Sequence, residues 1–516
     1  MLTRIGMTVA LVIAVLATAH FAFRPPSLEG RTITRAVEAS TSTVLGRLAL
    51  EPPSRQNGGS GVISMLDGPD ALAARIALIR EAEVALDVQY YIWARDTTGL
   101  ILLDELRKAA GRGVRIRLLL DDNGLRGLDN DLAALDALPN VEVRLFNPFI
   151  FRRLKPLGYA FDFVRLNRRM HNKSLTADGA VSILGGRNIG DVYFGFGSGV
   201  QFLDTDVMVT GKAAVDIGAD FDRYWQSRSS HPIARIVGQV NQNALDRMVS
   251  DASKAASSTD GRLYFERLRS SNLVRQIVAG TLSFEWTEVV VISDDPAKGM
   301  GEAEHKDLLF PQLMALLSKP SQSVDLVSAY FIPGRAFSDM LAALARSGIR
   351  VRILTNSQAA TDVVVVHSAY AKYRPQLLRS GVALYELKPE YSARDEPHME
   401  GRAGSSRASL HSKTLAVDEK RIFIGSFNFD PRSVFLNTEM GVLIDSPRMA
   451  KDLSTYFSER FHQVSYVPEL TGDAAIAWAE IGTDGVRIFH QTEPGTNFMS
   501  RLLLRILGLL PIEWLL

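Results

Sequence analysis

Two histidines of this chain begin the same short phrase, His-x-Lys followed after four residues by Asp. A histidine next to a lysine suits chemistry at an anionic centre, because an imidazole can attack or move a proton while an ammonium group neutralises charge. The residues of the two phrases are His171, Lys173 and Asp178 in one copy and His411, Lys413 and Asp418 in the other.

Each phrase continues through a short apolar run to a turn of small residues that ends in asparagine. These asparagines are Asn188 and Asn428, and their separation along the chain equals that of His171 and His411. With 9 histidines in 516 residues, chance is a poor explanation for two such matches in step. We infer an internal duplication with one half-site per copy, and we expect function to lie where the copies meet.

Paired histidines, lysines and asparagines suit displacement at a phosphodiester. This reaction needs a nucleophile, an acid for the leaving oxygen and donors for the non-bridging oxygens. One imidazole would attack phosphorus to form a phosphohistidine, and the other would protonate the departing alcohol and then activate the incoming one. Lys173, Lys413, Asn188 and Asn428 would hold the oxygens. Because residues i and i+2 of a strand share a face, each histidine is expected to point the same way as its lysine.

Two carboxylates are predicted to set the histidine tautomers. Asp206 and Glu439 end the matching strings Phe-Leu-Asp-Thr-Asp and Phe-Leu-Asn-Thr-Glu, and each can accept a hydrogen bond from an imidazole nitrogen. Asp178 and Asp418 are instead predicted to be structural residues at hairpin turns, since Asp178 precedes a glycine in a strong turn signal.

The repeat extends to the elements that must position these residues. Strand-like runs at 87–92, 113–119 and 141–146 have counterparts at 325–332, 348–354 and 381–386. Helical patterns at 100–110 and 336–347 lie between the first two runs of each half and end at a glycine. We therefore predict an α/β fold of two duplicated domains with mixed, mostly parallel sheets, related by a pseudo-twofold axis with the active site between them.

Length and composition accommodate two such domains. The predicted organisation is a signal anchor or signal peptide at 1–25, a linker at 26–60, an N-terminal domain at 61–270, a C-terminal domain at 271–495 and an apolar amphipathic segment at 496–516. The formal net charge of +1 gives no overall electrostatic footprint for nucleic acid. The absence of cysteine excludes disulfides and thiolate zinc sites.

Both ends of the chain point to a membrane. The apolar run at 6–23 lies at the lower edge of what spans a bilayer, and small residues at 17 and 19 also fit a signal cleavage site, so a retained anchor and a cleaved signal both stay open. The C-terminal residues 498–516 are too interrupted to span, and they suit either a membrane interface or packing against the domain core. A basic patch at 152–169 suits either phosphate attraction or a solvated loop.

At these residues the chain resembles the phospholipase D superfamily, whose hallmark is this phrase twice in one polypeptide. Longer strings look like the bacterial cardiolipin synthase branch, closest to its C-type enzymes, over roughly residues 60–516; they are residues 171–178, 185–191, 90–93 and 328–334. The resemblance implies phosphatidyl transfer between two phospholipids through a histidine-linked intermediate, with no metal and no other cofactor. In the family a carboxylate beyond each motif orients its histidine, which favours Glu439 for His411 and Asp206 for His171. Ser426 and Gly186, in the small-residue turns, are predicted to bind substrate.

The resemblance also implies partners and a location. The expected partners are phosphatidylglycerol, with phosphatidylethanolamine as an alternative donor, the membrane, no nucleic acid, and an accessory membrane protein whose need stays open. The expected location is the bacterial inner membrane, attached by the N-terminal apolar segment, with the periplasmic side favoured for the active site. Two alternatives remain: a phospholipase D-type hydrolase of phospholipids, and a nuclease or phosphodiesterase of the superfamily, against which the balanced charge and apolar ends argue.

Overall fold

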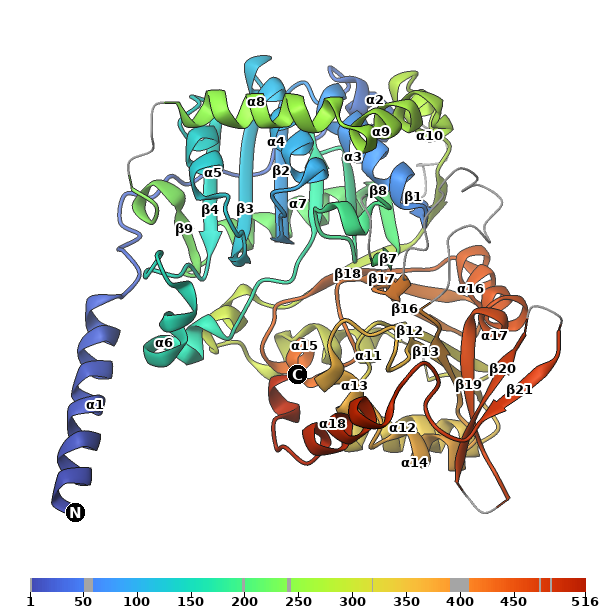
Figure 1. Ribbon diagram of the computed structural model, residues 1–516. Coiled ribbons are helices and arrows are strands. Elements are labelled where there is room, and N and C mark those ends of the chain that lie inside the picture. Colours follow the sequence, from blue (N-terminus) through green and yellow to red (C-terminus); the bar gives the residue numbers. More distant parts are fainter. Residues whose placement is uncertain are drawn as a thin grey trace.

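The structure is a computed structural model that describes residues 2–50, 59–196, 200–238, 243–317, 319–389, 408–472, 475–482 and 485–516. Each half of the chain forms a large mixed sheet with helices packed on it, and the first half lies above the second in Figure 1. The predicted α/β fold with duplicated halves is therefore confirmed.

The first sheet has nine strands in the order β10-β1-β8-β6-β5-β2-β3-β4-β9. Strands β2, β3 and β4 run parallel, because helices α4 (Thr97–Gly111) and α5 (Asp129–Asp136) cross over between them. The hairpin β5–β6 lies antiparallel beside β2, which brings the first phrase to the middle of the sheet. The strand bounds are β1 Ser60–Met65, β2 Ala85–Ile92, β3 Arg115–Gly124, β4 Val141–Phe146, β5 Ser174–Ala177, β6 Val181–Gly185, β8 Asp206–Gly211, β9 Ser230–Pro232 and β10 Glu285–Thr287.

The second sheet has ten strands and repeats this plan in the order β11-β18-β17-β16-β12-β13-β14-β19-β20-β21. Strands β12, β13 and β14 run parallel, and the hairpin β16–β17 lies antiparallel beside β12. The strand bounds are β11 Val289–Ser293, β12 Ser323–Ser328, β13 Arg350–Asn356, β14 Ala383–Leu387, β16 Lys413–Val417, β17 Arg421–Gly425, β18 Met440–Ile444, β19 Ser465–Leu470, β20 Ile476–Ile481 and β21 Arg487–His490. A separate small sheet pairs β7 (Gln201–Leu203) with β15 (Ala408–Leu410), one strand from each half.

The sheets are mixed, as predicted, but the prediction that they are mostly parallel is wrong. Among the described strands of the two large sheets, parallel pairing is confined to β2–β3–β4 and β12–β13–β14. Helical crossovers produce these parallel pairs, whereas the phrase-bearing hairpins and the edge strands add antiparallel pairs.

Alternate residues of the central strands face two different cores, as the period of a strand requires. Leu86 of β2 packs in a core with α3 (Gly68–Glu81) and α4, while Leu119 of β3 faces the other way and packs with Phe221 of α7 (Lys212–Trp225). A third core joins the halves: Val209 of β8 and residues of α7 pack with Val442 of β18 and with α16. This shared core holds the two sheets in a fixed relation.

The helices of the second half are arranged much like those of the first. Their bounds are α11 Leu309–Leu316, α12 Gly334–Arg346, α13 Val364–Tyr370, α14 Arg374–Arg379, α15 Pro431–Phe435, α16 Pro447–Glu459 and α17 Phe461–Val464. Phe457 of α16 packs against β12 and β13, as Phe221 of α7 packs against the first sheet.

The chain passes from one sheet to the other between β10 and β11, beyond the boundary predicted at 270–271. Helices α8 (Ala244–Ser257), α9 (Thr259–Ser270) and α10 (Asn272–Val278) cover the first domain in Figure 1. Tyr264 and Ile277 lie in its core, and β10 pairs with β1, so this region belongs to the first domain.

The N-terminal helix α1 (Leu2–Ala22) projects from the body of the protein (Figure 1). Among the described residues it is the one helix long and apolar enough to cross a membrane. The segment predicted as a linker is partly packed: Arg31 donates to three carbonyls of residues 226–230, and Leu45 of α2 (Val44–Leu50) is buried in the first core. Residues 51–58 of that segment lie outside the described part of the chain.

Candidate active site

The two histidine phrases meet at the boundary between the halves. His171 and His411 are each 6% exposed. The ring centroid of Tyr91 lies 5.0 Å from that of His171, and the ring centroid of Tyr193 lies 5.2 Å from that of His411. The ammonium group of each half also acts on the histidine of the other: besides burial, Lys413 lowers the pKa of His171 and Lys173 lowers that of His411. The two half-sites therefore form one site.

The two histidines lie just before the strands of their phrases and not within them. β5 begins at Ser174 and β16 begins at Lys413, so each histidine precedes its strand. Lys173 donates to the carbonyl oxygen of His171 at 2.5 Å, and Lys413 makes the equivalent bond to His411. Each lysine thus folds back against its own histidine and places its charge beside the imidazole.

Each histidine takes its carboxylate from the other half of the chain. His171 Nδ1 lies 2.8 Å from Oε2 of Glu439, and His411 Nδ1 lies 2.5 Å from Oδ2 of Asp204. The predicted pairing of Glu439 with His411 and of Asp206 with His171 is wrong on both counts. Asp204 is the site residue that sequence reasoning missed.

Backbone pairing between the halves explains this exchange. Strand β7 runs parallel to β15, and Leu203 of β7 accepts a hydrogen bond from the backbone N–H of His411 at 2.8 Å. In the other half-site, Thr438 accepts from the backbone N–H of His171 at 2.8 Å. Asp204 follows Leu203 and Glu439 follows Thr438 in the sequence. The pairing that holds each histidine therefore also delivers the carboxylate that faces it.

The strand register shows why the matching strings indicate Asp206 in place of Asp204. The N–H of Gly186 donates to Thr205 O at 3.2 Å, and that of Ser426 donates to Met440 O at 2.8 Å. By this register Asp204, not Asp206, is the counterpart of Glu439. The matching Phe-Leu-x-Thr strings are displaced by two residues, and a shift of two keeps a side chain on the same face of a strand. The sequence signal for Asp204 is that it is the first acidic residue of Asp204-Thr205-Asp206.

Asp206 has a structural position instead. Its carboxylate accepts from Arg75 Nη2 at 2.8 Å and from the backbone N–H of Arg187 at 3.2 Å, and it is fully buried. Burial and the paired charge of Arg75 give this aspartate a role in holding the first domain together.

The small residues predicted to bind substrate support the carboxylates. The Ser426 hydroxyl donates to Oε2 of Glu439, the oxygen that faces His171. Gly186 stands at the equivalent place in the other half, where a Cβ atom would lie 2.1 Å from Oδ1 of Asp204. In one half a hydroxyl group therefore binds the carboxylate, and in the other half the missing side chain of glycine leaves room for it.

The two asparagines differ in their surroundings. Asn188 accepts from the backbone N–H of Ile92 at 3.1 Å and donates to the hydroxyl of Tyr193 at 3.0 Å. Asn428 is 4% exposed, and within the described residues its Oδ1 atom has no hydrogen-bond partner. The contacts of Asn188 are therefore with the protein itself, whereas Asn428 keeps hydrogen-bonding capacity.

The aspartates of the two phrases lie at turns outside the site. Asp178 adopts a left-handed φ of 52° in the β5–β6 turn, and its carboxylate accepts from the backbone N–H groups of Glu83, Val84 and Ala85. Asp418 has a φ of 55° and holds residues 321–323 in the same way. Each carboxylate ties its hairpin to the start of the neighbouring central strand.

Burial gives the ionisable groups of the site unusual pKa values. Burial and the charge of Lys413 lower the pKa of His411 to about 4, and burial lowers that of Lys173 to about 7. Burial also raises the pKa of Glu439 to about 7. Asp204 shifts the other way: burial opposes its ionisation, but the charges of His411 and Lys413 outweigh that effect and lower its pKa. The two carboxylates thus have different ionisation tendencies.

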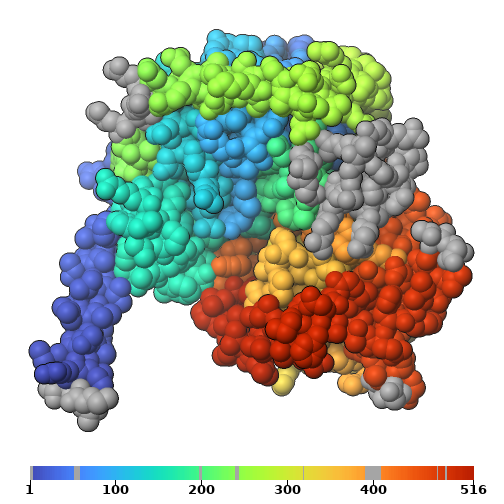
Figure 2. Space-filling view, viewed as in Figure 1, coloured from blue at the N-terminus to red at the C-terminus, as the bar shows by residue number. Residues whose placement is uncertain are grey.

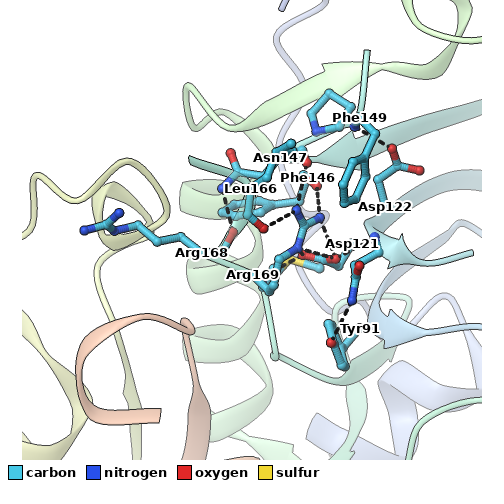
Figure 3. A network of polar contacts seen from close by, with 12 residues as sticks. Tyr91, Asp121, Asp122, Phe146, Asn147, Phe149, Leu166, Arg168 and Arg169 are labelled. Carbon is cyan, nitrogen blue, oxygen red and sulfur yellow. Dashed lines mark hydrogen bonds and ion pairs between the residues drawn. The ribbon is translucent and has the colours of Figure 1, made fainter. Parts of the chain in front are cut away.

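A buried ion pair holds the segment that leads into His171 (Figure 3). The guanidinium of Arg169 binds Asp121 through Nε at 2.9 Å and Nη2 at 2.7 Å, and Asp121 Oδ2 accepts from the N–H of Met170 at 2.8 Å. In the second half, Asn356 ends β13 and accepts from the N–H of Leu410 at 2.8 Å. Each half therefore anchors the residue before its histidine with a side chain of its second parallel strand, β3 or β13.

Internal ion pairs also account for most of the basic patch at 152–169. Arg152 and Lys155 both pair with Asp122, Arg165 pairs with Asp162, and Arg169 pairs with Asp121. Because these four cations are neutralised within the domain, they are not free to bind phosphate.

The arrangement is suited to displacement at a phosphorus atom. Ser426 and His171 both reach Oε2 of Glu439, so the histidine donates from Nδ1 and leaves Nε2 with a free lone pair. The second imidazole lies beside an ionised carboxylate, which favours its protonated form against the opposing effects of burial and Lys413. Two lysines supply positive charge for the non-bridging oxygens.

Comparison with known proteins agrees with this chemistry. A family model described as "Cardiolipin synthase, PLD-like domain" matches residues 76–225 and 313–461, one stretch in each half. Cardiolipin synthase C of Escherichia coli K12 is 46% identical over 463 residues, which is 90% of this chain and 98% of that protein. A cardiolipin synthase of Staphylococcus aureus Mu50 is 26% identical over 76% of this chain and 65% of its own length. The crystal structure of phosphatidylserine synthase from Haemophilus influenzae has a similar fold, with a TM-score of 0.52 and 16% identity over 80% of this chain and 91% of that one.

Proposed function

The chain belongs to the family of cardiolipin synthases with phospholipase D-like domains, and we propose that it is a cardiolipin synthase, a phosphatidyltransferase that moves a phosphatidyl group from a donor phospholipid to phosphatidylglycerol. The observation that carries the proposal is the pair of buried histidines at the domain boundary, each facing a carboxylate of the other half. The family membership that the two phrases indicate is confirmed.

In the first step we assign His171 as the nucleophile. Its Nε2 lone pair attacks phosphorus, a nitrogen–phosphorus bond forms, and the bond from phosphorus to the donor's headgroup oxygen breaks. His411 gives its Nε2 proton to that oxygen, so the headgroup leaves as a neutral alcohol. Bound phosphodiester raises the pKa of the buried imidazole, and Asp204 stabilises the imidazolium.

The second step reverses these roles. A free hydroxyl of phosphatidylglycerol gives its proton to His411 and attacks phosphorus, and the bond between phosphorus and His171 breaks. Both histidines return to their starting states, so atoms and protons balance over the cycle. Lys173 and Lys413 balance the charge on the non-bridging oxygens throughout, and Asn428 is buried with an unpaired Oδ1.

The donor is phosphatidylglycerol or phosphatidylethanolamine in this proposal, because the first step needs only a headgroup alcohol that can leave. Exclusion of water decides the product: a glycerol hydroxyl at the phosphohistidine gives cardiolipin, whereas water gives phosphatidate. The burial of both histidines favours transfer. A need for an accessory membrane protein would appear as activity that depends on the host membrane.

We place the enzyme at the bacterial inner membrane, attached by α1, with the active site on the periplasmic side. An apolar helix at the N-terminus behind one basic residue has the form of an export signal or signal anchor. Because the chain has no cysteine, one cysteine introduced at exposed Val215 reports the side through its reaction with an impermeant thiol reagent in intact cells.

Lipid mass spectrometry on a cardiolipin-free bacterial host tests the function. The intact chain is expected to produce cardiolipin, and the His171→Ala variant is expected to produce none while accumulating to the same level in membranes. Phosphatidate in place of cardiolipin would identify a hydrolase. Cardiolipin from the His171→Ala variant would overturn the assigned mechanism.

A further inference from the structure

The C-terminal helix α18 (Phe498–Gly508) turns its apolar side toward solvent. Asn497 caps its first turn together with Ser500. Exposed apolar residues then recur every three or four positions, with exposed fractions such as 52% for Ile506 and 85% for Leu509. We call these residues the α18 stripe: Met499, Leu502, Leu503, Ile506, Leu509 and Leu510. A helix on a soluble domain normally buries such a stripe, and a continuous exposed one marks an interaction surface.

Contacts on both sides of the helix hold it in this orientation. Before α18, Glu493 pairs with Arg374 at 2.6 Å and lies 3.1 Å from His367. After it, Glu513 bonds to the hydroxyl of Tyr373, and the carbonyl oxygen of Leu516 accepts from the N–H of Arg432 at 2.7 Å. The stripe is therefore held outward by a fixed chain on either side, and no residue of α18 is buried in the domain core.

The α18 stripe lies near the other apolar surfaces of the molecule. Arg432, which binds the C-terminus, also binds the side chain of Asn167 at 2.6 Å, and Asn167 ends α6 (Tyr159–Leu166). Phe23 beside α1 stacks on Phe161 of α6 at 5.4 Å. Figure 2 shows α1, α6 and α18 in the lower half of the same view. Around α6 the exposed apolar side chains are Leu154, Leu157, Phe163 and Val164.

We propose that the α18 stripe docks on a phospholipid bilayer. Helix α1, the candidate membrane span, already brings this side of the molecule to a membrane. The helix carries Arg501 and Arg505 and no acidic residue, so its charge complements anionic lipid. Trp514 beyond it is 57% exposed, and tryptophan prefers the headgroup region.

Docking there would bring the active site close to the lipid surface. Asn167 lies four residues before His171, and Arg432 lies four residues after Asn428, so the contact between α6 and the C-terminus borders the site. The inference deepens the proposed function and rests on it for the identity of the substrate.

A depth measurement on the full-length chain tests the docking. Because the sequence has no cysteine, Ile506→Cys can be labelled at one position with an environment-sensitive fluorophore. The matched control is Val215→Cys on α7, where the side chain is 57% exposed. Both proteins are reconstituted into vesicles of phosphatidylglycerol and phosphatidylethanolamine with nitroxide-labelled lipid. We expect quenching of at least about twofold at position 506, strongest for shallow nitroxides, because an interfacial helix lies roughly 5–10 Å deep, and none at 215.

Helix α1 anchors both labelled proteins, so attachment alone cannot produce this difference. Equal lack of quenching at 506 and 215 would overturn the docking. Fluorescence at 506 that does not respond to nitroxide lipid but changes on dilution of the protein would show that the stripe binds a second copy of the chain. This result would also overturn the docking. Transfer activity is measured in parallel in detergent micelles: loss of quenching with transfer intact rejects the docking alone, and loss of transfer with quenching intact rejects the proposed function alone.

A charge substitution gives an independent readout. The double variant Leu503→Glu, Ile506→Glu changes two exposed positions, so Tm is expected to stay the same while KM for lipid in anionic vesicles rises about tenfold. The control places the same two charges at exposed Val486 and Ile488 of the second domain. An equal KM in both variants would contradict the proposal.

Discussion

Glu439 lies 2.8 Å from Nδ1 of His171 although the two residues belong to different halves of the chain. Asp204 stands in the same relation to His411, at 2.5 Å. Neither pair forms within one domain, because the backbone of each histidine segment pairs with the strand that carries the opposite carboxylate.

Asp204 and Asp206 are two residues apart, and their substitutions are expected to affect different properties of the protein. Asp204→Asn should reduce kcat by about 10²–10⁴-fold, the usual contribution of acid–base catalysis, because His411 loses its charged partner. Asp206→Asn should instead lower Tm, because it leaves the buried guanidinium of Arg75 without its ion pair. Steady-state kinetics and thermal unfolding on both variants check this. The reverse pattern would restore the assignment made from the sequence.

Position 186 should not tolerate a serine, although Ser426 occupies the matching position in the other half. A Cβ atom at position 186 would lie 2.1 Å from Oδ1 of Asp204, so Gly186→Ser is expected to displace that carboxylate and reduce kcat at least about 10²-fold. Ser426→Ala removes one hydrogen bond to Glu439 and should cost less. Transfer assays compare the two, and full activity in Gly186→Ser would show that Asp204 can move without loss.

Lys173 is expected to give the reaction an alkaline limit. Burial lowers its pKa to about 7, so it loses its proton as pH rises through that value and can no longer balance phosphoryl charge. We expect kcat/KM to fall above about pH 7. Arginine stays charged over this range, so Lys173→Arg should move the fall to higher pH while lowering the maximum about 10-fold through its different shape. If the fall stays in place in Lys173→Arg, it belongs to Glu439, whose pKa is also raised to about 7, or to Lys413.

The aspartates of the two phrases are expected to affect stability rather than turnover. Asp178→Ala removes the acceptor for the N–H groups of Glu83, Val84 and Ala85, at a cost of about 2–4 kcal/mol in the free energy of unfolding. Asp178→Asn keeps an acceptor oxygen and tolerates the φ of 52°, so it should cost less. Denaturant unfolding measures both. A large fall in kcat for correctly folded Asp178→Ala would give this residue a catalytic role after all.

Much of the fold was predictable from the sequence because the duplication makes the pattern of each helix or strand appear twice. The predicted helix at 100–110 lies inside α4, and the predicted run at 141–146 coincides with β4. The proportion of parallel strands was not predictable, because hairpins and edge strands such as β10 join sheets through partners far away in the sequence.

The histidines and lysines of the site were predictable, whereas their partners were not. Residue types and spacing within one strand identify His171 and Lys173, but Asp204 reaches His411 only through pairing between β7 and β15. A shift of two residues leaves the pattern of faces unchanged, so alternation along a strand does not distinguish Asp204 from Asp206.

The exchange of carboxylates makes a complete active site depend on the contact between the two domains. Because each histidine faces a carboxylate of the other half, one half of the chain by itself contains no complete histidine–carboxylate pair. Both pairs therefore form only where the two halves are in contact.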